Sequence, residues 1–370
     1  MNLGAVERNC RHLASLLTGG GALCAVVKAD GYGHGAVPCA KAALAGGASW
    51  LAVATGPEAA ELRAAGLDGR ILVMGALMGA ELEAALDARA DVVAWSGDFV
   101  TALADRAAAV TDPAGAGDRP VGVHVKLDTG MGRLGTLDPD EARALCDRVA
   151  EAPGIELAGV MTHFATADEP GDDHFEAQLQ AFTSFAAEVK RAHPGVVAHA
   201  ANSAAVYRDK AAHFDMARCG IAIYGLDPFH EDPGARGLEP ALSLESYVAA
   251  VKPFEIGRSA GYGRRWRAPQ PTSIGVLPIG YGDGWRRGLT NNAEVLVGGR
   301  RRPLVGTVSM DNVTVDLGPE PDVKPGAPAV LIGEQDGERI WCEEVAARLD
   351  TINYEITCGI GPRVPRRYVR

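Results

Sequence analysis

Over the first 225 residues of this 370-residue chain, short apolar runs alternate regularly with helix-like stretches. Eight such runs, each leading into a helical stretch, favour a parallel (β/α)8 barrel, and a segment of this length suits one. A doubly wound open sheet is the alternative, because it also alternates strands with helices. The runs span 23–28, 50–54, 71–74, 92–95, 121–127, 155–161, 196–200 and 214–218.

The stretches between these runs have apolar residues every three or four positions, which predicts amphipathic helices packed on a core. Pro57 and Pro139 each fall where a helix should begin, a position that tolerates the missing N–H. The clearest helical stretches span 57–65, 79–89, 139–151 and 173–192.

The pattern changes after residue 227, where a connector rich in Pro, Gly and acidic residues spans 228–240. Beyond it, β-type runs alternate with Gly/Pro turns, and the helical pattern recurs only at 342–349. We therefore predict a barrel domain over 1–227 and a mostly antiparallel β domain over 228–370. The β-type runs span 247–252, 273–279, 294–297, 303–308, 312–317 and 328–332.

Composition excludes several classes of protein. The chain is 47% hydrophobic, which excludes a disordered chain, and its net charge of −11 argues against a nucleic-acid partner. The longest apolar stretch, 42–55, is too short for a membrane segment, and the first ten residues lack the pattern of a secretory signal. The seven cysteines are scattered without a C-x-x-C pair, which predicts reduced thiols in a cytoplasmic protein and no metal site.

Charged residues follow the first and fifth strand runs, and the C-terminal ends of barrel strands are where chemistry is found. Lys28 ends the first run and is followed by three glycines within seven residues. A lone lysine there is usually a solvated charge, but apolar neighbours can make it a nucleophile or a proton carrier. The fifth run exits into Lys126, Asp128 and Arg133, for which a salt-bridged surface turn is the default interpretation.

The residues that follow the last three strand runs include a histidine and groups that can bind an anion. His163 follows the sixth run; alone, it would be interpreted as a buried, satisfied histidine. The loops after strands seven and eight of such barrels favour phosphate, and these loops carry Ser203 and Gly220. Arg218 ends the eighth run, and the chain has neither a P-loop motif nor a dinucleotide-binding glycine motif. Together these exits predict a site for an anionic ligand.

Motifs along nearly the whole chain resemble those of the alanine racemases. That family joins a barrel to a β domain and carries about one further strand before the segment that matches the start of this sequence. The matching motifs are AVVKADGYGHGA (25–36), KLDTGMGRLG (126–135), THFATADE (162–169), ANS (201–203), ARCGIAIYGL (217–226), SAGYGR (259–264), GYGDG (280–284), GTVSMDN (306–312) and NYEITCGIGPRVPR (353–366).

The resemblance implies a pyridoxal 5′-phosphate (PLP) enzyme in which Lys28 holds the cofactor as an aldimine. Arg218 would face the pyridine nitrogen, and His163 would pack beside the ring and link to Arg218. Arg133 would bind the cofactor phenolate and the substrate carboxylate, supported by Lys126, which is carbamylated in many relatives. The other cofactor-binding residues would be Tyr32, Asn202, Ser203, Gly220, Ile221 and Tyr354, all but Asn202 at the phosphate.

The same resemblance implies a homodimer that interconverts L- and D-alanine with two bases. Lys28 would move the proton of the D side, and Tyr262 of the partner subunit that of the L side. Tyr281, Met310 through its N–H, and Asp311 would complete the substrate pocket from the β domain.

Three alternatives stay open on the sequence. A racemase for serine, lysine or arginine is the nearest, although Tyr281 and Tyr354 favour a small side chain. A PLP-carrier barrel without catalytic activity would lack the β domain and therefore Tyr262. A PLP decarboxylase of basic amino acids would present a carboxylate to the pyridine nitrogen, where this chain has Arg218.

Overall fold

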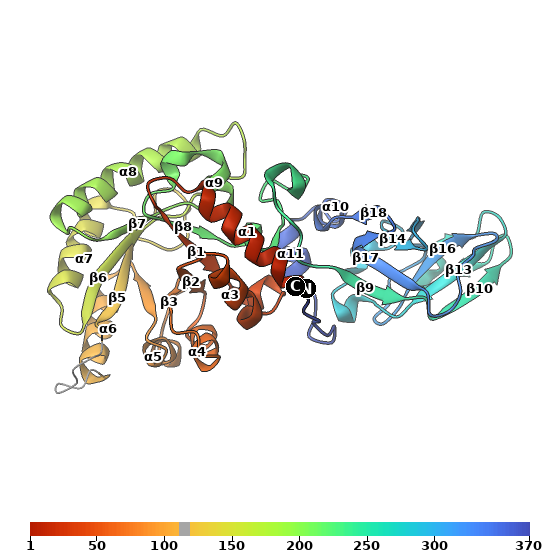
Figure 1. The fold of residues 1–370 in the computed structure, drawn as a ribbon, viewed down its shortest axis with the longest axis horizontal. Coiled ribbons are helices and arrows are strands. Elements are labelled where there is room, and N and C mark those ends of the chain that lie inside the picture. The colour runs from red at the N-terminus through yellow and green to blue at the C-terminus, as the bar shows by residue number, and fades with distance from the viewer. Residues whose placement is uncertain (111–118) are drawn as a thin grey trace. The chain divides into compact units, whose positions relative to one another are not determined.

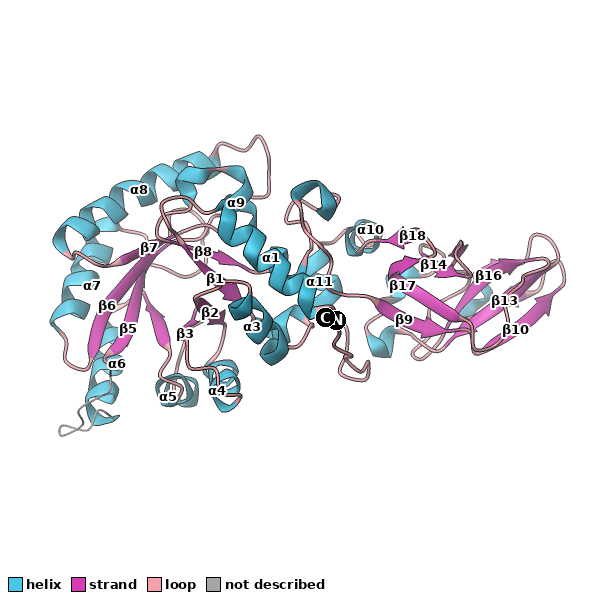
Figure 2. Cartoon of the chain, in the orientation of Figure 1, coloured by secondary structure: helices cyan, strands magenta, loops and turns pink. Residues whose placement is uncertain are grey.

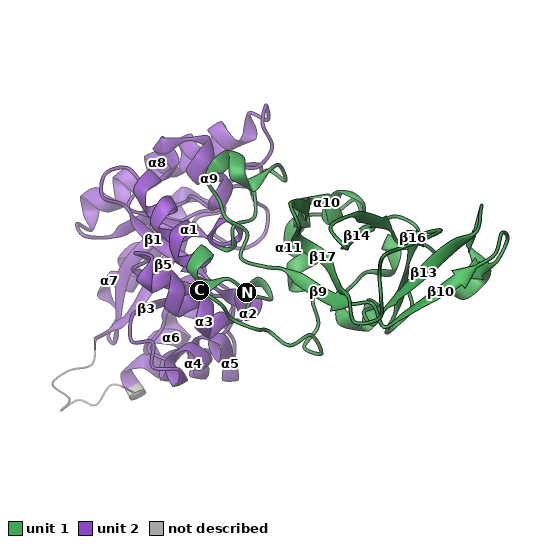
Figure 3. Cartoon of the chain, turned by 45° about the vertical axis from the view of Figure 1, so that its right-hand side comes forward, with its two compact units in different colours: residues 1–5, 32–34, 224–370 green, residues 6–31, 35–223 purple. Residues whose placement is uncertain are grey.

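The computed structural model describes residues 1–110 and 119–370 (Figure 1). The chain forms two compact units, coloured separately in Figure 3. One unit comprises residues 6–31 and 35–223, and the other comprises residues 1–5, 32–34 and 224–370. The short segment 32–34, which directly follows the Lys28 turn, therefore belongs to the second unit although the sequence on both sides belongs to the first.

The first unit contains a parallel barrel with helices around its strands (Figure 2). Its strands are hydrogen-bonded in the order β7-β6-β5-β4-β3-β2-β1-β8. Backbone bonds from Asp215 N–H to Ala198 (3.0 Å) and from Arg218 N–H to Ala201 (2.9 Å) join the last two strands. The barrel prediction is confirmed, and the open sheet is excluded. The strands are β1 (Ala22–Val26), β2 (Trp50–Val53), β3 (Arg70–Val73), β4 (Asp91–Ala94), β5 (Val121–Lys126), β6 (Ile155–Met161), β7 (Val197–His199) and β8 (Met216–Cys219).

The predicted barrel helices are present, and their starts have clear sequence causes. Thr55 and Glu58 form a capping box before α4, with Pro57 in the first turn. Asp138 caps α7, which begins at Pro139. The helices up to residue 224 are α1 (Leu3–Leu16), α2 (Lys28–Tyr32), α3 (Ala36–Ala45), α4 (Gly56–Ala64), α5 (Ala80–Asp87), α6 (Gly97–Val110), α7 (Pro139–Glu151), α8 (His174–Ala192), α9 (Ser203–Arg208), η1 (Lys210–Ala212) and η2 (Ile221–Tyr224).

The rest of the chain is mostly antiparallel β structure, as expected. One sheet has the order β10-β13-β16, another has β15-β14-β17-β18 with β9 beside β17, and β11 pairs with β12. The strands are β9 (Leu244–Tyr247), β10 (Ala250–Phe254), β11 (Ser259–Ala260), β12 (Trp266–Arg267), β13 (Thr272–Leu277), β14 (Glu294–Val297), β15 (Arg301–Pro303), β16 (Val313–Gly318), β17 (Pro328–Gln335) and β18 (Glu338–Ile340). The helices are η3 (Pro233–Arg236), η4 (Tyr262–Arg264), η5 (Tyr281–Asp283), η6 (Arg287–Leu289), α10 (Cys342–Ala347) and α11 (Asn353–Cys358).

Three local predictions for this part are wrong. The run 247–252 is not one strand: β9 ends at Tyr247 and β10 begins at Ala250, and the two join different sheets. The run 303–308 is a strand only to Pro303, because Gly306 turns the chain with φ 83°. A second helix, α11, follows α10; its β-branched residues and uncapped start hide it from a periodicity analysis.

Two predictions about composition can be compared with this structure. Within the described ranges, no helix is both long and apolar enough to cross a membrane. All seven cysteines, for which the sequence predicts reduced side chains, carry thiols in the structure, and six of them are buried.

Candidate active site

Lys28 stands at the start of a left-handed turn that follows β1. Ala29 (φ 52°), Asp30 (φ 51°) and Gly31 (φ 60°) all have left-handed backbone angles. Such a conformation costs a residue with a side chain about 1–2 kcal/mol. Two carboxylates hold the turn: Glu58 accepts the N–H of Ala29 at 2.7 Å, and Asp30 accepts that of Ala36 at 2.9 Å. The half-buried Lys28 is therefore held by a strained and well-fixed backbone rather than by a solvated loop.

Arg218, near the end of β8, is buried with hydrogen-bond acceptors around it. Its Nη1 donates to Nδ1 (2.7 Å) and to the carbonyl (3.0 Å) of His199. Its Nη2 donates to the carbonyls of Thr162 (2.8 Å) and Ala200 (3.0 Å) and faces Nδ1 of His163 at 3.2 Å. Every Nη hydrogen is thus engaged, and in the described part of the chain only the Nε–H of this guanidinium has no acceptor.

The charge of Arg218 has no direct counter-ion. No carboxylate among the described residues lies within ion-pair distance of the guanidinium, which is bonded to neutral groups instead. Burial lowers the pKa of Arg218 to about 10, and the nearby Cys24 and Cys219 thiols act in the opposite direction. At neutral pH the group remains a cation that can donate a hydrogen bond but does not readily release a proton.

Lys126 and His163 sit in the field of the other cations. Burial, followed by the charges of Arg218 and Arg133, lowers the pKa of Lys126 to about 8. Burial and the charges of Arg218, Lys126, Arg133 and Lys28 hold the pKa of His163 well below its usual value. His163 is therefore neutral, and because Arg218 donates to its Nδ1, its proton is on Nε2. A cluster of cations of this kind favours an anionic ligand.

The loop that carries Arg133 is organised by one carboxylate. Oδ1 of Asp128 accepts the N–H groups of Gly130 (3.0 Å), Met131 (2.7 Å) and Gly132 (3.1 Å), and Oδ2 accepts that of Arg133 (2.9 Å). These four bonds lower the pKa of Asp128 against the effect of its burial. The salt-bridged surface turn considered for this loop is wrong, because Asp128 makes no ion pair in the described chain.

The predicted phosphate cradle after β7 and β8 is formed by neighbouring groups. Oγ of the buried Ser203 accepts the N–H groups of Gly220 (3.1 Å) and Ala222 (3.3 Å). With two N–H groups at the oxygen, the hydroxyl hydrogen can donate to an anion. The side chain of Asn202 caps α9 by accepting the N–H of Ala205 at 2.9 Å. This cap fixes the start of the helix that carries Ser203.

The second unit brings together the two other tyrosines expected at the phosphate. The rings of Tyr32 and Tyr354 are 5.9 Å apart between centroids, and Tyr224 lies 5.3 Å from Tyr32. Asn353 anchors the start of α11 by donating to the carbonyl of Asp227 (2.8 Å). The helix missed by the sequence patterns is therefore the element that positions Tyr354.

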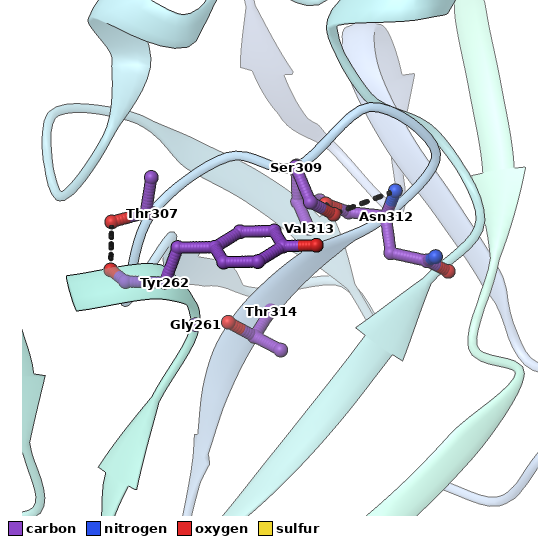
Figure 4. Close-up of a pocket in the computed structure, with 7 residues that line it drawn as sticks. All are labelled: Gly261, Tyr262, Thr307, Ser309, Asn312, Val313 and Thr314. Carbon is purple, nitrogen blue, oxygen red and sulfur yellow. Dashed lines mark hydrogen bonds between the residues drawn. The ribbon is translucent and has the colours of Figure 1, made fainter. Parts of the chain in front are cut away.

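Tyr262 lies on an exposed turn between β11 and β12, with 72% of its surface accessible. Its carbonyl accepts the hydroxyl of Thr307 at 2.6 Å, and Gly261 has φ 70°. Tyr262 lines a cavity of about 340 Å³, and Figure 4 shows its ring among the other residues that line it. The residues that line it are Gly261, Tyr262, Thr307, Ser309, Asn312, Val313 and Thr314.

Tyr281 and Met310 are neighbours in the same unit, and both are exposed. The N–H of Tyr281 donates to the carbonyl of Ser309 at 3.1 Å, and 42% and 51% of the surfaces of Tyr281 and Met310 are accessible. Arg363 bridges Asp283 and Asp311, at 2.9 Å from an oxygen of each. The carboxylate of Asp311 is thus engaged by Arg363, a residue that the sequence did not single out.

Sequence reasoning also missed a buried glutamine that supports His163. Oε1 of Gln178 accepts the N–H of Ala165 (2.8 Å), while its Nε2 donates to Thr129 (3.1 Å) and to the carbonyl of His163 (3.1 Å). It therefore ties the loops after β5 and β6 together. The only indication of Gln178 in the sequence is its position, as a polar residue, on the predicted buried face of the helical stretch 173–192. No group of three metal-binding side chains occurs in the ranges that the structure describes.

Comparisons with known proteins cover the whole chain. The family model described as "Alanine racemase, N-terminal domain" matches residues 1–228, and that of the C-terminal domain matches 241–368. The alanine racemase of Symbiobacterium thermophilum is 42% identical, covering 100% of this chain and 96% of its own. That of Frankia casuarinae is 45% identical, covering 100% and 95%.

Solved structures agree with the sequence matches. The alanine racemase of Streptomyces coelicolor A3(2) superimposes with a TM-score of 0.92 at 39% identity, covering 100% of this chain and 97% of that chain. The enzyme of Bacillus anthracis, solved with bound L-Ala-P, gives 0.88 at 37% identity and covers 100% and 94%. With both domains matched in order and relatives this similar over the full length, the chain belongs to the alanine racemases, a family of PLP-dependent isomerases.

Proposed function

We propose that this protein interconverts L- and D-alanine, with PLP bound covalently through Nζ of Lys28. The observation that carries the proposal is the set of four cations, Lys28, Lys126, Arg133 and Arg218, that act together on the neutral His163. An isolated cluster of this charge is unfavourable, and an anionic cofactor and an anionic substrate would relieve it. Domain 1–227 would hold the cofactor, and domain 228–370 would contribute to the site of the partner subunit.

The residues present suit PLP, which carries a phosphate, a phenolate and a pyridine nitrogen. The Nε–H of Arg218, which meets no acceptor among the described residues, offers a donor to the nitrogen, and the hydroxyl of Ser203 offers one to the phosphate. Arg133 would bind the phenolate, supported by Lys126. The phosphate would be bound by Tyr32, Ser203, Gly220, Ile221 and Tyr354.

When bound, PLP supplies a conjugated system that takes up the negative charge developing at the α-carbon of an amino acid. Inversion then needs a proton donor on each face of that carbon. Lys28 would serve the D side, because its amine can take a proton once the substrate has replaced it. Tyr262 of the partner subunit would serve the L side.

A tyrosine must lose its proton to act as a base, and its ordinary pKa is about 10. His163 can help, because its neutral ring holds the proton on Nε2 while Arg218 donates to Nδ1. An Nε2–H directed at the phenolic oxygen of Tyr262 would stabilise the tyrosinate. Arg218 would reinforce this donor through the same ring.

Arg218 also limits the reaction. A guanidinium does not readily transfer a proton to the pyridine nitrogen, as a carboxylic acid would, so the ring remains a moderate acceptor of electrons. We infer that this suppresses transamination. The carboxylate of the substrate would be bound by Arg133 and the N–H of Met310, and Tyr281 and Tyr354 would restrict the side chain. Asp311, held by Arg363, would shape this part of the pocket rather than receive a substrate charge.

A racemase for larger amino acids is the second candidate, because three residues that would line the substrate pocket, Tyr281, Met310 and Asp311, are exposed in this chain. The test is to incubate the purified protein with L-alanine, L-serine, L-lysine and L-arginine separately and to measure the D-enantiomer formed. We expect D-alanine as the main product. Borohydride treatment followed by peptide mass spectrometry should locate the reduced cofactor on Lys28; a cofactor at another lysine, or no D-alanine, would contradict the proposal.

A further inference from the structure

A continuous line of buried polar side chains runs through the barrel interior. It joins Asp91 at the start of β4, His124 on β5, His199 at the end of β7 and Arg218 near the end of β8. The two histidines are completely buried, and Asp91 is 1% exposed. We call these four residues the barrel relay. Of the four, only Arg218 has a role in the proposed function.

The chemistry of the two ends fixes the direction of every hydrogen bond. Arg218 can only donate, so Nδ1 of His199, at 2.7 Å, is an acceptor and the proton of this ring is on Nε2. That Nε2–H donates to Nδ1 of His124 at 2.7 Å, so His124 also carries its proton on Nε2. Nε2 of His124 then faces the carboxylate of Asp91 at 3.5 Å, which can only accept. Both imidazoles are consequently neutral and have the same tautomer.

The far end of the relay is kept charged. Asp91 pairs with Arg70 at 2.7 Å and with Arg119. Burial alone would raise the pKa of Asp91, but the hydrogen bond from His124 and the charges of Arg70 and Arg119 lower it. Arg218 therefore interacts with a fixed negative charge through two neutral rings and has no carboxylate beside it.

The backbone around the relay leaves room for it. A Cβ at Gly159 on β6 would come within 2.2 Å of Nδ1 of His124, and one at Gly122 within 2.6 Å of the carboxyl carbon of Asp91. The pairing of β5 with β6 shifts register between Val123 and His124. Two glycines and a local irregularity at this place show that the strands are shaped around these polar side chains.

We propose that Asp91 and His124 are positioning residues for the Arg218 guanidinium and act on it through His199. The inference rests on the proposed role of Arg218 at the pyridine nitrogen. By holding Nδ1 of His199 as an acceptor, the relay fixes one Nη group of Arg218 and with it the direction of the Nε–H. It also stabilises the cation without a neighbouring carboxylate, which would compete with the ligand for that donor.

The first test is nitrogen NMR of the two histidines in the cofactor-free wild-type protein, which needs no active enzyme. Long-range proton–nitrogen spectra distinguish protonated from unprotonated ring nitrogens, and variants at each position assign the signals. We expect both rings to carry their proton on Nε2 and none on Nδ1 at neutral pH. A proton on Nδ1 of either ring would overturn the proposal.

The second test compares His124→Leu with His124→Asn, because asparagine can place an oxygen near the position of Nδ1. His124→Leu should alter the His199 nitrogen shifts and the side-chain N–H signal of Arg218, and after PLP loading should lower kcat about tenfold with little change in KM. His124→Asn should restore the shifts and most of kcat. If the two variants have equal effects, His124 acts only by filling space.

A matched control separates positioning from loss of stability. His213 is equally buried, and its ring bonds Thr18 and the carbonyl of Val206 outside the relay. His213→Leu should destabilise the fold while leaving the Arg218 signals unchanged and kcat within about threefold of wild type. Equal disturbance of the Arg218 signals in this control would overturn the proposal. A wild-type protein that shows the expected tautomers but forms no D-alanine would instead refute the proposed function.

Discussion

The barrel and the β domain contribute to the proposed site in opposite ways. In the barrel, Arg218 is buried and engaged by neighbouring strands through all of its Nη hydrogens. In the β domain, Tyr262, Tyr281 and Met310 are 72%, 42% and 51% exposed, on turns rather than strands. The barrel residues of the proposed site are thus fixed by contacts within one chain. The β-domain half presents aromatic and apolar groups to the surface, as proteins do at interaction sites.

This difference separates residues whose geometry is fixed by packing within the chain from residues that the proposed partner subunit would have to order. A group fixed by buried hydrogen bonds is preorganised before any ligand arrives. An exposed tyrosine on a turn acquires a defined position only when something covers it. The following variants probe the two halves separately.

The largest effect is expected for Tyr262→Phe, which removes one of the two proposed bases. Racemisation should fall about 10²- to 10⁴-fold, the range typical of losing a general base. Because the barrel would bind PLP without the hydroxyl, the absorbance of the bound cofactor should be unchanged. Near-normal turnover in both directions would show that the β-domain half does not supply the base.

Arg218→Glu tests the barrel half and should lower kcat about 10- to 100-fold. A carboxylic acid can protonate the pyridine nitrogen, so the fraction of turnovers that yield pyridoxamine phosphate should rise. Product analysis by chromatography measures both quantities. Arg218→Lys, which keeps a cation, is the control and should not raise that fraction; unchanged partitioning in the Glu variant would contradict the role of Arg218.

The pH dependence of the stability of the cofactor-free protein should reflect the lowered pKa of Lys126. Its pKa falls from 10.5 to about 8 on folding, so the unfolded chain binds more protons between these values. This group therefore makes folding less favourable at low pH, and its contribution should rise as the pH increases from about 8 to about 10.5. In denaturant unfolding experiments, the free energy of unfolding should rise less with pH for Lys126→Met than for wild type. An equal rise in both proteins would mean that Lys126 is not buried in the folded protein.

The smallest effect is expected for Ala29→Gly in the left-handed turn after Lys28. Glycine removes the steric cost at φ 52°, but it also increases the entropy of the unfolded chain. The balance should raise the free energy of unfolding by about 0.5–1 kcal/mol. Gly66, with φ 76° and open space around it, offers the reverse control, since Gly66→Ala should destabilise the protein. A loss of stability in Ala29→Gly would mean that the turn is not strained.

The barrel could be predicted because its signals are local. Each strand is an apolar run, and Pro57 and Pro139 mark helix starts. The β domain was harder, since whether 247–252 forms one strand or two depends on which sheets its halves join. The short helix that carries Tyr354 has no cap and β-branched residues, so its pattern is weak.

The site residues divide in the same manner. Lys28 and Arg218 could be proposed from charges at strand exits and from motifs. Asp128 could not be distinguished from a surface ion pair, because its partners are backbone N–H groups whose directions depend on the folded loop. His124 lies within an apolar strand run; its partners come from strands far away in the sequence and could not be deduced from spacing.

The most direct test of a site shared between two chains is complementation of inactive subunits. Lys28→Ala and Tyr262→Phe proteins should each be inactive alone, but a hybrid dimer would contain one site with both bases intact. Random mixing makes about half of the dimers hybrids, so we expect about a quarter of wild-type alanine racemisation to return. No recovery in a purified hybrid would contradict the claim that the two bases come from different polypeptides.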